Sequence, residues 1–488
     1  MEALHKTLER CPSPEDYGTN YALLHSALKD YAQSIFYMPK ATQGLIDENA
    51  LAILKLLDPS QDTLAFLFVI NIALAQKEVS KEVLDKVVLF LCSFDVCQVR
   101  YAGAAFSALL TKIASESLFP PVVTINLLVE AMVRLEPSGT MFTNLHLPLA
   151  KLVYDCGDFD LAARVLDSDI LFYPSTANTK ESRPLCEPGL PPYVFMSTKT
   201  GLTSLVTASV VLEYNLVRSL IYISAHDWAK AYSALEQIVT HPCKDKSVSK
   251  IMIDAHKRWL LVSLLHTGKN PDSPPITSRS ALNVYHNKNR PYLVVADHFD
   301  TDNVIQFADA CQEHTQMWRA DATESLIDQV MMAYQKWRII NLKNIYVCLS
   351  LSQVRRATLD AVTRQPLPTN AALVVMLQEM VDSGMLKAII APEENDPDTE
   401  GSLLFTQSSQ WSSEKEFGDT ISRTVQSIKD LGQQYRLVDE RLSSNADYVR
   451  HLAHNKKRSE SEKELDPTLG FESQVEDEDL MTGIVVHS

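Results

Sequence analysis

The fold is decided by residues 346–406, which read YVCLSLSQVRRATLDAVTRQPLPTNAALVVMLQEMVDSGMLKAIIAPEENDPDTEGSLLFT. The run 346–349 is rich in β-prone residues and predicts a short strand. Ser352 stands before an apolar-periodic segment, where an N-cap belongs, and predicts that a helix begins there. Pro366 and Pro368 end this helix, because proline cannot continue the helical hydrogen-bond ladder.

A second helix follows the two prolines. Thr369 or Asn370 can cap its start, and Gly384 marks its end, because glycine commonly follows the last turn of a helix. Its apolar face recurs at i, i+4 and i+7, which is the spacing of one buried helix face. That face comprises Leu373, Leu377 and Met380.

Two strands, predicted at 385–390 and 402–406, complete this stretch, and the acidic loop 392–401 joins them. Strand, helix, helix and hairpin is the element order of a winged helix. Because an exposed strand edge can pair with a strand of a neighbouring protein, we predict that the hairpin is an assembly edge. A winged helix that only caps its own chain is the alternative. The predicted edge residues are Leu386, Ala388, Ile390, Leu403 and Phe405.

Charge argues against a DNA-binding winged helix. The second helix, 370–384, has no Lys or Arg, and it carries the acidic Glu379 and Asp382. A recognition helix offers basic or amide side chains to bases and phosphates. The chain as a whole has a net charge of −16 and is repelled by phosphate. We therefore expect no nucleic-acid partner.

The composition indicates a soluble, multidomain chain with little glycine for phosphate-binding loops. The 488 residues suffice for two to four domains, and the 46% hydrophobic content is ordinary for globular proteins. Only 14 glycines are present, and the chain has no GxGxxG, GxxxxGK[ST] or GxSxG motif. The apolar run 64–75 is too short for a membrane span and predicts a buried helix. The polar start indicates no secretory signal, so we expect an intracellular protein.

The cysteines and histidines show no metal-binding pattern. Eight cysteines are scattered without a CxxC pair, which predicts reduced, packed thiols. Among the histidines, only His451 and His454 approach ligand spacing, and no acidic partner motif accompanies them. We predict no catalytic residue, no cofactor and no metal site.

The N-terminal half is helical in period from residue 21 to about residue 135, with short connections that suggest stacked helical hairpins. Two segments, 158–166 and 227–235, share an Asp, an aromatic residue, an Ala and a Leu at matching positions. Their offset is 69 residues, about two tetratricopeptide periods of ~34 residues. The Pro- and Ser-rich stretch 175–192 predicts a loop inserted into this array.

A heptad pattern follows the winged helix. Apolar residues spaced by seven, with companions three residues later, predict one long helix over Phe417–Leu452, ~54 Å long at 1.5 Å per residue. We predict that this helix joins a bundle of several subunits, and the alternative is a helix folded back on its own chain. The predicted bundle residues are Ile421, Ile428, Leu431, Tyr435, Val438, Leu442 and Val449.

Five segments resemble the COP9 signalosome subunit 3 family of PCI-domain proteins. The similarity runs from about residue 201 to residue 405, whereas the N-terminal half resembles the family only in being helical. The loop near Pro191 and the acidic tail depart from the family pattern. The similar segments are 228–242, 249–269, 281–285, 349–359 and 377–390.

The resemblance implies an all-α protein with a small α+β module, namely a tetratricopeptide-like helical array followed by a PCI domain that ends in a winged helix. A long C-terminal helix comes next. The implied segments are a repeat arm at 1–200, the helical part of the PCI domain at 201–318, its winged helix at 319–406 and the bundle helix at 407–454. Residues 455–488 are polar, acidic and short of core residues, and this composition predicts a disordered acidic tail.

The resemblance also implies a function. In this family, winged helices of several subunits pair side by side, and the complex removes the ubiquitin-like modifier NEDD8 from cullin-RING ubiquitin ligases. Its catalytic zinc lies on another subunit with an HxH motif, which this sequence lacks. The implied role is a non-catalytic scaffold that binds other signalosome subunits, and cullin-RING ligases only indirectly, in the cytoplasm and nucleus. Lys456–Arg458 is a weak nuclear-import signal.

Two other functions stay open. A subunit of the proteasome regulatory lid or of a translation initiation assembly would share the same two-part architecture. An enzyme would need a site such as Asp254 with His256, or Cys348, but neither has a matching base, nucleophile and orienting group. His256 is expected to be a hydrogen-bonded structural residue.

Overall fold

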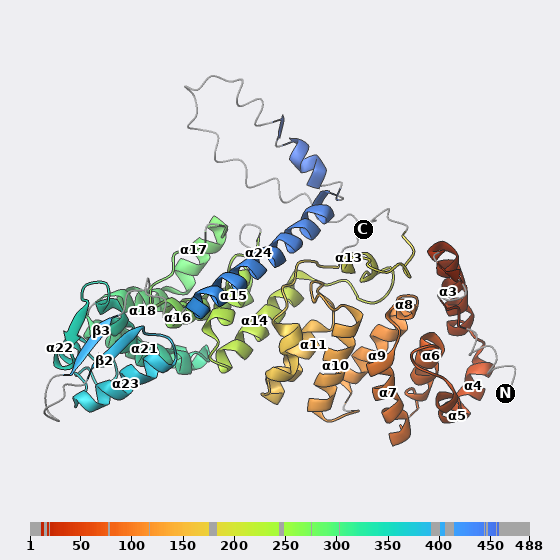
Figure 1. Ribbon diagram of the computed structural model, residues 1–488, viewed down its shortest axis with the longest axis horizontal. Helices are drawn as coiled ribbons and strands as arrows, with labels where there is room; N and C mark the ends of the chain where they lie inside the picture. Colours follow the sequence, from red (N-terminus) through yellow and green to blue (C-terminus); the bar gives the residue numbers. More distant parts are fainter. Residues whose placement is uncertain are drawn as a thin grey trace. The chain divides into compact units, whose positions relative to one another are not determined.

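The computed structural model shows a mostly helical chain with one small sheet, which confirms the predicted fold class (Figure 1). Contacts divide the chain into two compact units, Met1–Val239 and Thr240–Ser488. None of the helices that the structure describes is long and apolar enough to cross a membrane. The structure describes residues 11–457 except 14–16, 19, 77–78, 117, 175–182, 244–247, 275, 302, 392–400, 406–413, 444, 446–447 and 455.

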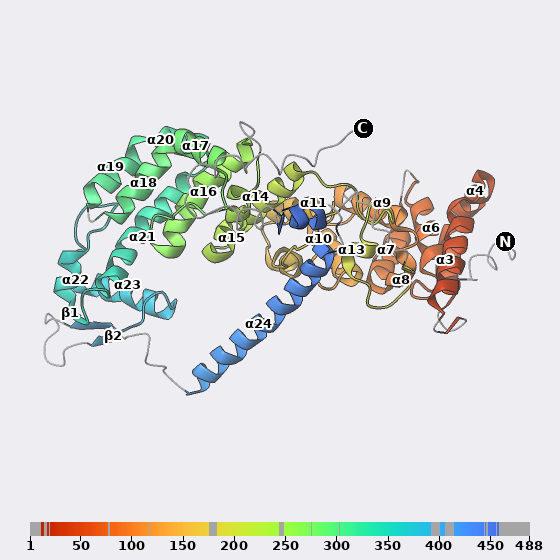
Figure 2. The ribbon, with the colours of Figure 1, turned by 90° about the horizontal axis from the view of Figure 1, so that it is seen from above.

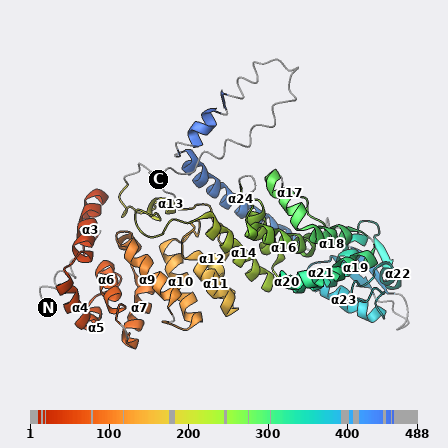
Figure 3. The same cartoon turned by 180° about the vertical axis from the view of Figure 1, so that it is seen from behind.

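The first unit is an array of helices that lie side by side from α3 to α11 (Figures 1 and 3). Its elements are α3 (Tyr21–Phe36), α4 (Lys40–Glu48), α5 (Ala50–Leu56), α6 (Thr63–Ala73), α7 (Lys81–Ser93), α8 (Val96–Val99), α9 (Gly103–Ser115), α10 (Pro121–Leu135), α11 (His146–Cys156), η1 (Asp160–Ala162), α12 (Ala163–Leu166), α13 (Pro192–Phe195), α14 (Ala208–Ser224) and α15 (Trp228–Val239).

Helix α6 is the most apolar of these helices, and nearly all of its side chains are buried. It packs against α3, α4, α5, α7 and α9, so its apolar surface is covered on every side. The prediction of a buried helix is therefore confirmed for residues 64–73, whereas Leu74 is the C-cap and Ala75 is exposed. Asn71, the polar residue within that run, donates its side-chain N–H to the carbonyl of Ala105 over 3.3 Å.

The two copies of the repeat motif fold differently. The second copy opens α15, whereas the first forms only the 3-10 turn η1 and the short helix α12. Soon after the first copy the chain returns toward residue 142, where the N–H of Phe142 donates to the carbonyl of Phe172 over 2.8 Å. The first copy therefore does not continue into a long helix. Both copies still bury the matched Ala and Leu: Ala162 and Leu166 in the first copy, and Ala231 and Leu235 in the second.

Helix α14 packs against α11 and against α15, and all three helices lie in the first unit. The domain division predicted from the sequence instead places residues 201–239, which include α14 and α15, in the helical part of the PCI domain. The domain boundaries at residues 200, 318, 406 and 454 stay predictions.

The second unit consists of a helical layer, the winged-helix module and a C-terminal helix. The helical layer comprises α16 (Lys250–Thr267), α17 (Arg279–Lys288), α18 (Arg290–Asp300), α19 (Val304–Glu313), α20 (Thr315–Ala320) and α21 (Glu324–Leu342). The module comprises β1 (Cys348–Ser350), α22 (Leu351–Ala357), α23 (Asn370–Asp382), β2 (Ala388–Ala391) and β3 (Ser402–Phe405), and α24 (Glu414–Ser443) follows it.

The start of α22 differs from the prediction. Ser350, not Ser352, is the N-cap, and its hydroxyl accepts a hydrogen bond from the N–H of Gln353 over 3.3 Å. The Gln353 side chain accepts in return from the Ser350 N–H over 3.1 Å, which completes a capping box. The helix begins at Leu351 because this reciprocal pair satisfies two backbone donors that a cap at Ser352 would leave unpaired.

The second helix of the module follows the sequence more closely. Thr369 caps α23 through a hydrogen bond from the N–H of Ala372 over 3.2 Å. The helix closes at Ser383, and Gly384 takes the left-handed conformation with φ of +73°. Leu373, Leu377 and Met380 are buried as predicted.

The three strands form an antiparallel sheet in the order β1-β3-β2, and β3 lies in its centre. Helices α22 and α23 lie against one face of this sheet (Figure 2). Strand β2 begins at Ala388 rather than at residue 385, because the Leu386 N–H donates to the carbonyl of Met380 and ties that residue to the end of α23. The predicted acidic loop lies, except for Gly401, outside the described residues.

Helix α24 ends at Ser443, so the predicted unbroken helix to residue 452 is wrong. Asn445 is not helical, and a further short helical piece covers residues 448–454. The Asn445 side chain accepts a hydrogen bond from the N–H of Tyr448 over 3.4 Å, as an N-cap does. Asn445 therefore marks the start of the second helical piece. The acidic tail beyond residue 457 lies outside the described residues.

Candidate assembly surfaces

The residues predicted as the edge of the winged helix point inward instead. Leu386, Leu403 and Phe405 are buried in the core of the module, and Ala388 and Ile390 pack against that core while half-buried. The prediction that the Leu403–Phe405 strand offers a free edge is wrong, because β3 is paired with β1 on one side and with β2 on the other. Their side chains hold the module together.

The outward face of the sheet carries a different set. Cys348 on β1, Leu404 on β3 and Ile389 on β2 are aligned across the three strands. All three side chains are exposed. Strand β2 has one neighbour in the described part of the chain, so its other backbone edge is an open pairing edge. We call β2 with this row of three residues the sheet surface.

The sequence contained a signal for the sheet surface, but the predicted edge residues did not include it. Side chains alternate between the two faces of a strand, so placing Leu386, Ala388 and Ile390 inward puts Ile389 outward. The strand order carries no such local signal. It brings residues more than 50 positions apart, Cys348 and Leu404, into one row.

The helices of the module present little positive charge. One of the two arginines of α22, Arg355, donates its Nη1 to the carbonyl of Pro368 over 2.9 Å and fixes the turn between the helices. On α23, Glu379 lies 4.0 Å from the Lys336 ammonium, and Asp382 accepts from Gln378 over 2.8 Å. This pattern suits a protein partner better than nucleic acid.

The predicted bundle residues lie on α24 and on the helical piece after it. Most of their side chains are apolar and exposed, and together they form a stripe. Five of them are between 46% and 72% exposed, whereas Val438 and Leu442 are half-buried. Regularly spaced, exposed apolar residues on a helix indicate a surface that a partner covers. We call these seven residues the helix stripe. The five exposed members are Ile421, Ile428, Leu431, Tyr435 and Val449.

The groups considered for an enzyme site have structural partners. His256 is buried, stacks on Tyr285 with ring centroids 4.3 Å apart, and its Nδ1 accepts from the Asn289 side chain over 3.1 Å. Burial lowers its pKa to about 4, so the ring is neutral near pH 7. Asp254 forms an ion pair with Arg258 on the same helix. The expected burial and hydrogen bonding of His256 are confirmed, and its purely structural role stays a prediction.

Two kinds of candidate remain: the cysteines, and side chains that could hold a metal ion. Cys348 is an exposed free thiol on the sheet surface, and all eight cysteines are free. In the parts of the chain that the structure describes, no group of three His, Cys, Asp or Glu side chains is placed to hold a metal ion.

Together these features define a helical-repeat protein with a PCI-like winged-helix module. The family model of the COP9 signalosome complex subunit 3, N-terminal helical repeats, matches residues 46–281. The chain belongs to the COP9 signalosome subunit 3 family, as the resemblance of its sequence predicted.

Three relatives, each named COP9 signalosome complex subunit 3, are similar over much of the chain. The Neurospora crassa protein is 32% identical, and the match covers 94% of this chain and 95% of the relative. The Emericella nidulans protein is 28% identical over 62% of this chain and 63% of the relative. The Arabidopsis thaliana protein is 21% identical over 91% of this chain and 92% of the relative. The N-terminal half is thus also family-like, and the restriction of the resemblance to residues 201–405 was too narrow.

Proposed function

We propose that this chain is a non-catalytic scaffold subunit of the COP9 signalosome. The observation that carries the proposal is the helix stripe, because a member of this family that exposes five large apolar side chains at heptad spacing is built to be covered by other subunits. When partner helices remove these side chains from water, the assembly is stabilised by about 25 cal/mol per Å² of apolar surface buried.

The sheet surface supports a second contact. Strand β2 offers unpaired backbone groups along one edge, and the exposed Ile389 stands beside that edge. A neighbouring winged helix that adds a strand there would extend the sheet, with main-chain hydrogen bonds supplying affinity and the apolar row supplying specificity. We propose that this surface binds the winged helix of another signalosome subunit.

The proposed role in catalysis is indirect. The complex would remove NEDD8 from cullin-RING ubiquitin ligases through a partner metalloprotease subunit, and this chain would hold that partner in the assembly. It would contact the ligases only through the complex. The hydrogen bond of His256 to Asn289 and the ion pair of Asp254 support this division of labour, since both residues already have structural partners.

A pull-down of the tagged full-length chain from cells tests the proposal. Mass spectrometry should identify signalosome subunits, and the eluate should remove NEDD8 from a neddylated cullin. A chain lacking residues 414–454 should lose most partners and the activity, whereas the control lacking only residues 458–488 should keep both. Recovery of proteasome-lid or translation-initiation subunits instead would overturn the assignment, and a full partner set without residues 414–454 would exclude the helix stripe.

We propose that the chain occurs in both cytoplasm and nucleus. The basic run Lys456–Arg458 supports nuclear entry only weakly, because short basic runs are common. Imaging of a fluorescent fusion tests the location. Replacing Lys456 and Lys457 by Ala should lower the nuclear fraction if this run drives import, and signal confined to one compartment in the unchanged chain would contradict the proposal.

A further inference from the structure

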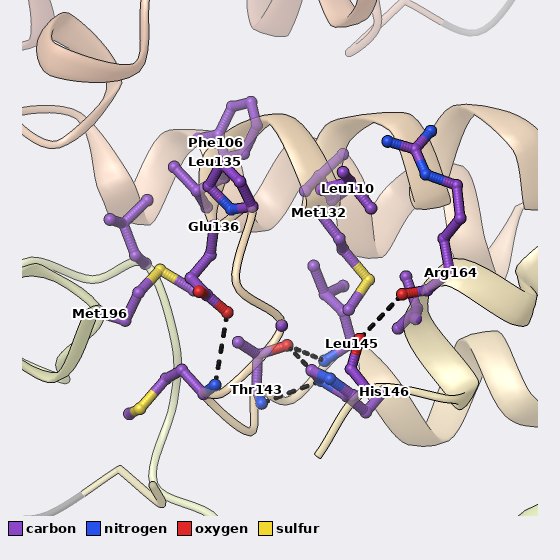
Figure 4. A pocket seen from close by; sticks show the side chains of 17 residues that line it. Phe106, Leu110, Met132, Leu135, Glu136, Thr143, Leu145, His146, Arg164 and Met196 are labelled. Atoms are coloured by element: carbon purple, nitrogen blue, oxygen red, sulfur yellow. Dashed lines mark hydrogen bonds between the residues drawn. The ribbon is translucent and has the colours of Figure 1, made fainter. Parts of the chain in front are cut away.

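The first unit contains a pocket of about 230 Å³ that the proposed function does not use (Figure 4). Its walls come from α9, α10, α11 and α12 and from the connections between them, and Ser168, Met196 and Leu202 from the later segments complete it, all within Met1–Val239. Most lining side chains are apolar, and three of them are methionines, whose flexible thioethers adapt to the shape of a bound group. The apolar lining includes Phe106, Leu110, Met132, Met141, Met196 and Leu202.

His146 brings a hydrogen-bond donor to this apolar lining. It is only 3% exposed, and its Nδ1 accepts from the backbone N–H of Thr143 over 3.0 Å. Because Nδ1 accepts that hydrogen bond, the proton of the neutral ring is on Nε2. Burial lowers the pKa of His146 to about 4, which keeps the ring neutral. Within the described residues, its hydrogen bonds are to Thr143 alone, so Nε2–H has no acceptor.

Glu136 brings a hydrogen-bond acceptor to the same pocket. Its side chain is 6% exposed, and its carboxyl oxygens accept from the Ser138 hydroxyl and, over 3.4 Å, from the N–H of Met141. The backbone N–H groups of Ser138 and Thr140 also interact with this carboxylate, which holds it in place at the pocket wall. Burial raises the pKa of Glu136, as expected for a carboxyl held away from water.

We propose that this pocket binds a small, flat aromatic molecule of about two fused rings that carries one hydroxyl or amide group. An apolar cavity of roughly 150 Å³ holds benzene, so the larger pocket here has room for a second ring. The polar group of the ligand accepts from His146 Nε2–H or donates to the Glu136 carboxyl. An apolar pocket with a few buried polar groups of shifted pKa is the common form of a small-molecule site.

The probe for the test is 2-naphthol, with naphthalene as the matched compound that lacks the hydroxyl. We expect 2-naphthol to bind the full-length chain and naphthalene to bind about tenfold more weakly, because one net hydrogen bond is lost. The variant Met132→Trp fills the pocket from α10 and should abolish binding. The control Met332→Trp makes the same change at an exposed methionine of α21 and should leave binding unchanged.

Methyl spectra of the unmodified chain keep the proposal testable if Met132→Trp does not fold. With ¹³C-labelled methionine methyl groups, 2-naphthol should shift the signals of Met132, Met141 and Met196 and leave the signal of Met332 in place. Equal binding of the two compounds, binding that survives Met132→Trp, or unshifted signals for the three pocket methionines would each overturn the proposal.

Discussion

Ile389 on the edge strand β2 lies directly opposite Leu404 on the central strand β3, and both side chains face outward, 54% and 39% exposed. An edge strand with exposed apolar side chains readily pairs with a strand of another chain. A protein that acts as a monomer would therefore be expected to cover this position or to place a charged residue there. The pair therefore marks the surface at which we expect a neighbouring subunit.

Replacing Ile389 by Asp should weaken subunit association about fivefold or more, because a charge on the edge strand disfavours strand pairing. The free chain should unfold at nearly the same temperature, since Ile389 is outside the core of the module. Binding to partner subunits and thermal unfolding are the two measurements. Val375→Asp, at an exposed apolar position on α23, is the control. Equal loss of binding in both variants would contradict a specific sheet surface.

Replacing Ile428 by Asp tests the helix stripe. The side chain is 63% exposed in the free chain, so stability of the isolated protein should hardly change. In a bundle, the buried and unpaired charge should cost several kcal/mol of assembly, on the order of 2–4 kcal/mol. Co-purification with signalosome subunits measures the effect, and Ser427→Asp on the neighbouring position is the control. Wild-type stoichiometry of all partners with Ile428→Asp would rule out this seam.

Removing the hydroxyl of Ser350 tests the capping box. Ser350→Ala leaves the Gln353 N–H without its acceptor and should destabilise α22 by about 1 kcal/mol. Hydrogen exchange of the α22 amides should accelerate about fivefold if they exchange by opening of this helix. Ser352→Ala, at the position that the sequence suggested, should accelerate exchange less. Faster exchange in Ser352→Ala than in Ser350→Ala would instead identify Ser352 as the N-cap.

Acid should destabilise the chain through its buried histidines. The folded-state pKa of His256 is about 4, whereas an unfolded histidine titrates near 6.5. Between these values the unfolded state binds more protons, so the free energy of unfolding falls as pH falls from about 6.5 toward 4. For His256 the loss from pH 7 to pH 5 is roughly 2 kcal/mol.

Urea unfolding at pH 7 and pH 5 measures this dependence. His256→Gln should reduce the difference between the two pH values, because Gln does not titrate. His451→Gln, at an exposed position after α24, serves as the control. An unchanged pH dependence in His256→Gln would show that the ring is not held neutral in the folded chain.

Local chemistry determined which segments are helical and which side chains they bury. Leu373, Leu377 and Met380 lie on one face at helical spacing, and Thr369 can cap the helix through its own side chain. The heptad residues follow the same rule, since spacing by seven places them on one side of a helix. Family membership was also readable from the sequence, although its N-terminal extent was not.

The contacts between distant residues were decided only by the tertiary structure. Whether Ser350 or Ser352 caps α22 depends on where β1 ends. Strand β1 ends where Ser350 pairs with Ser402 of β3. The central place of β3 turns Leu403 and Phe405 into core residues, and no local pattern encodes strand order. The pocket around His146 joins residues from 106 to 202. Spacing along the chain fixes the faces of helices and strands, but only packing decides which faces meet.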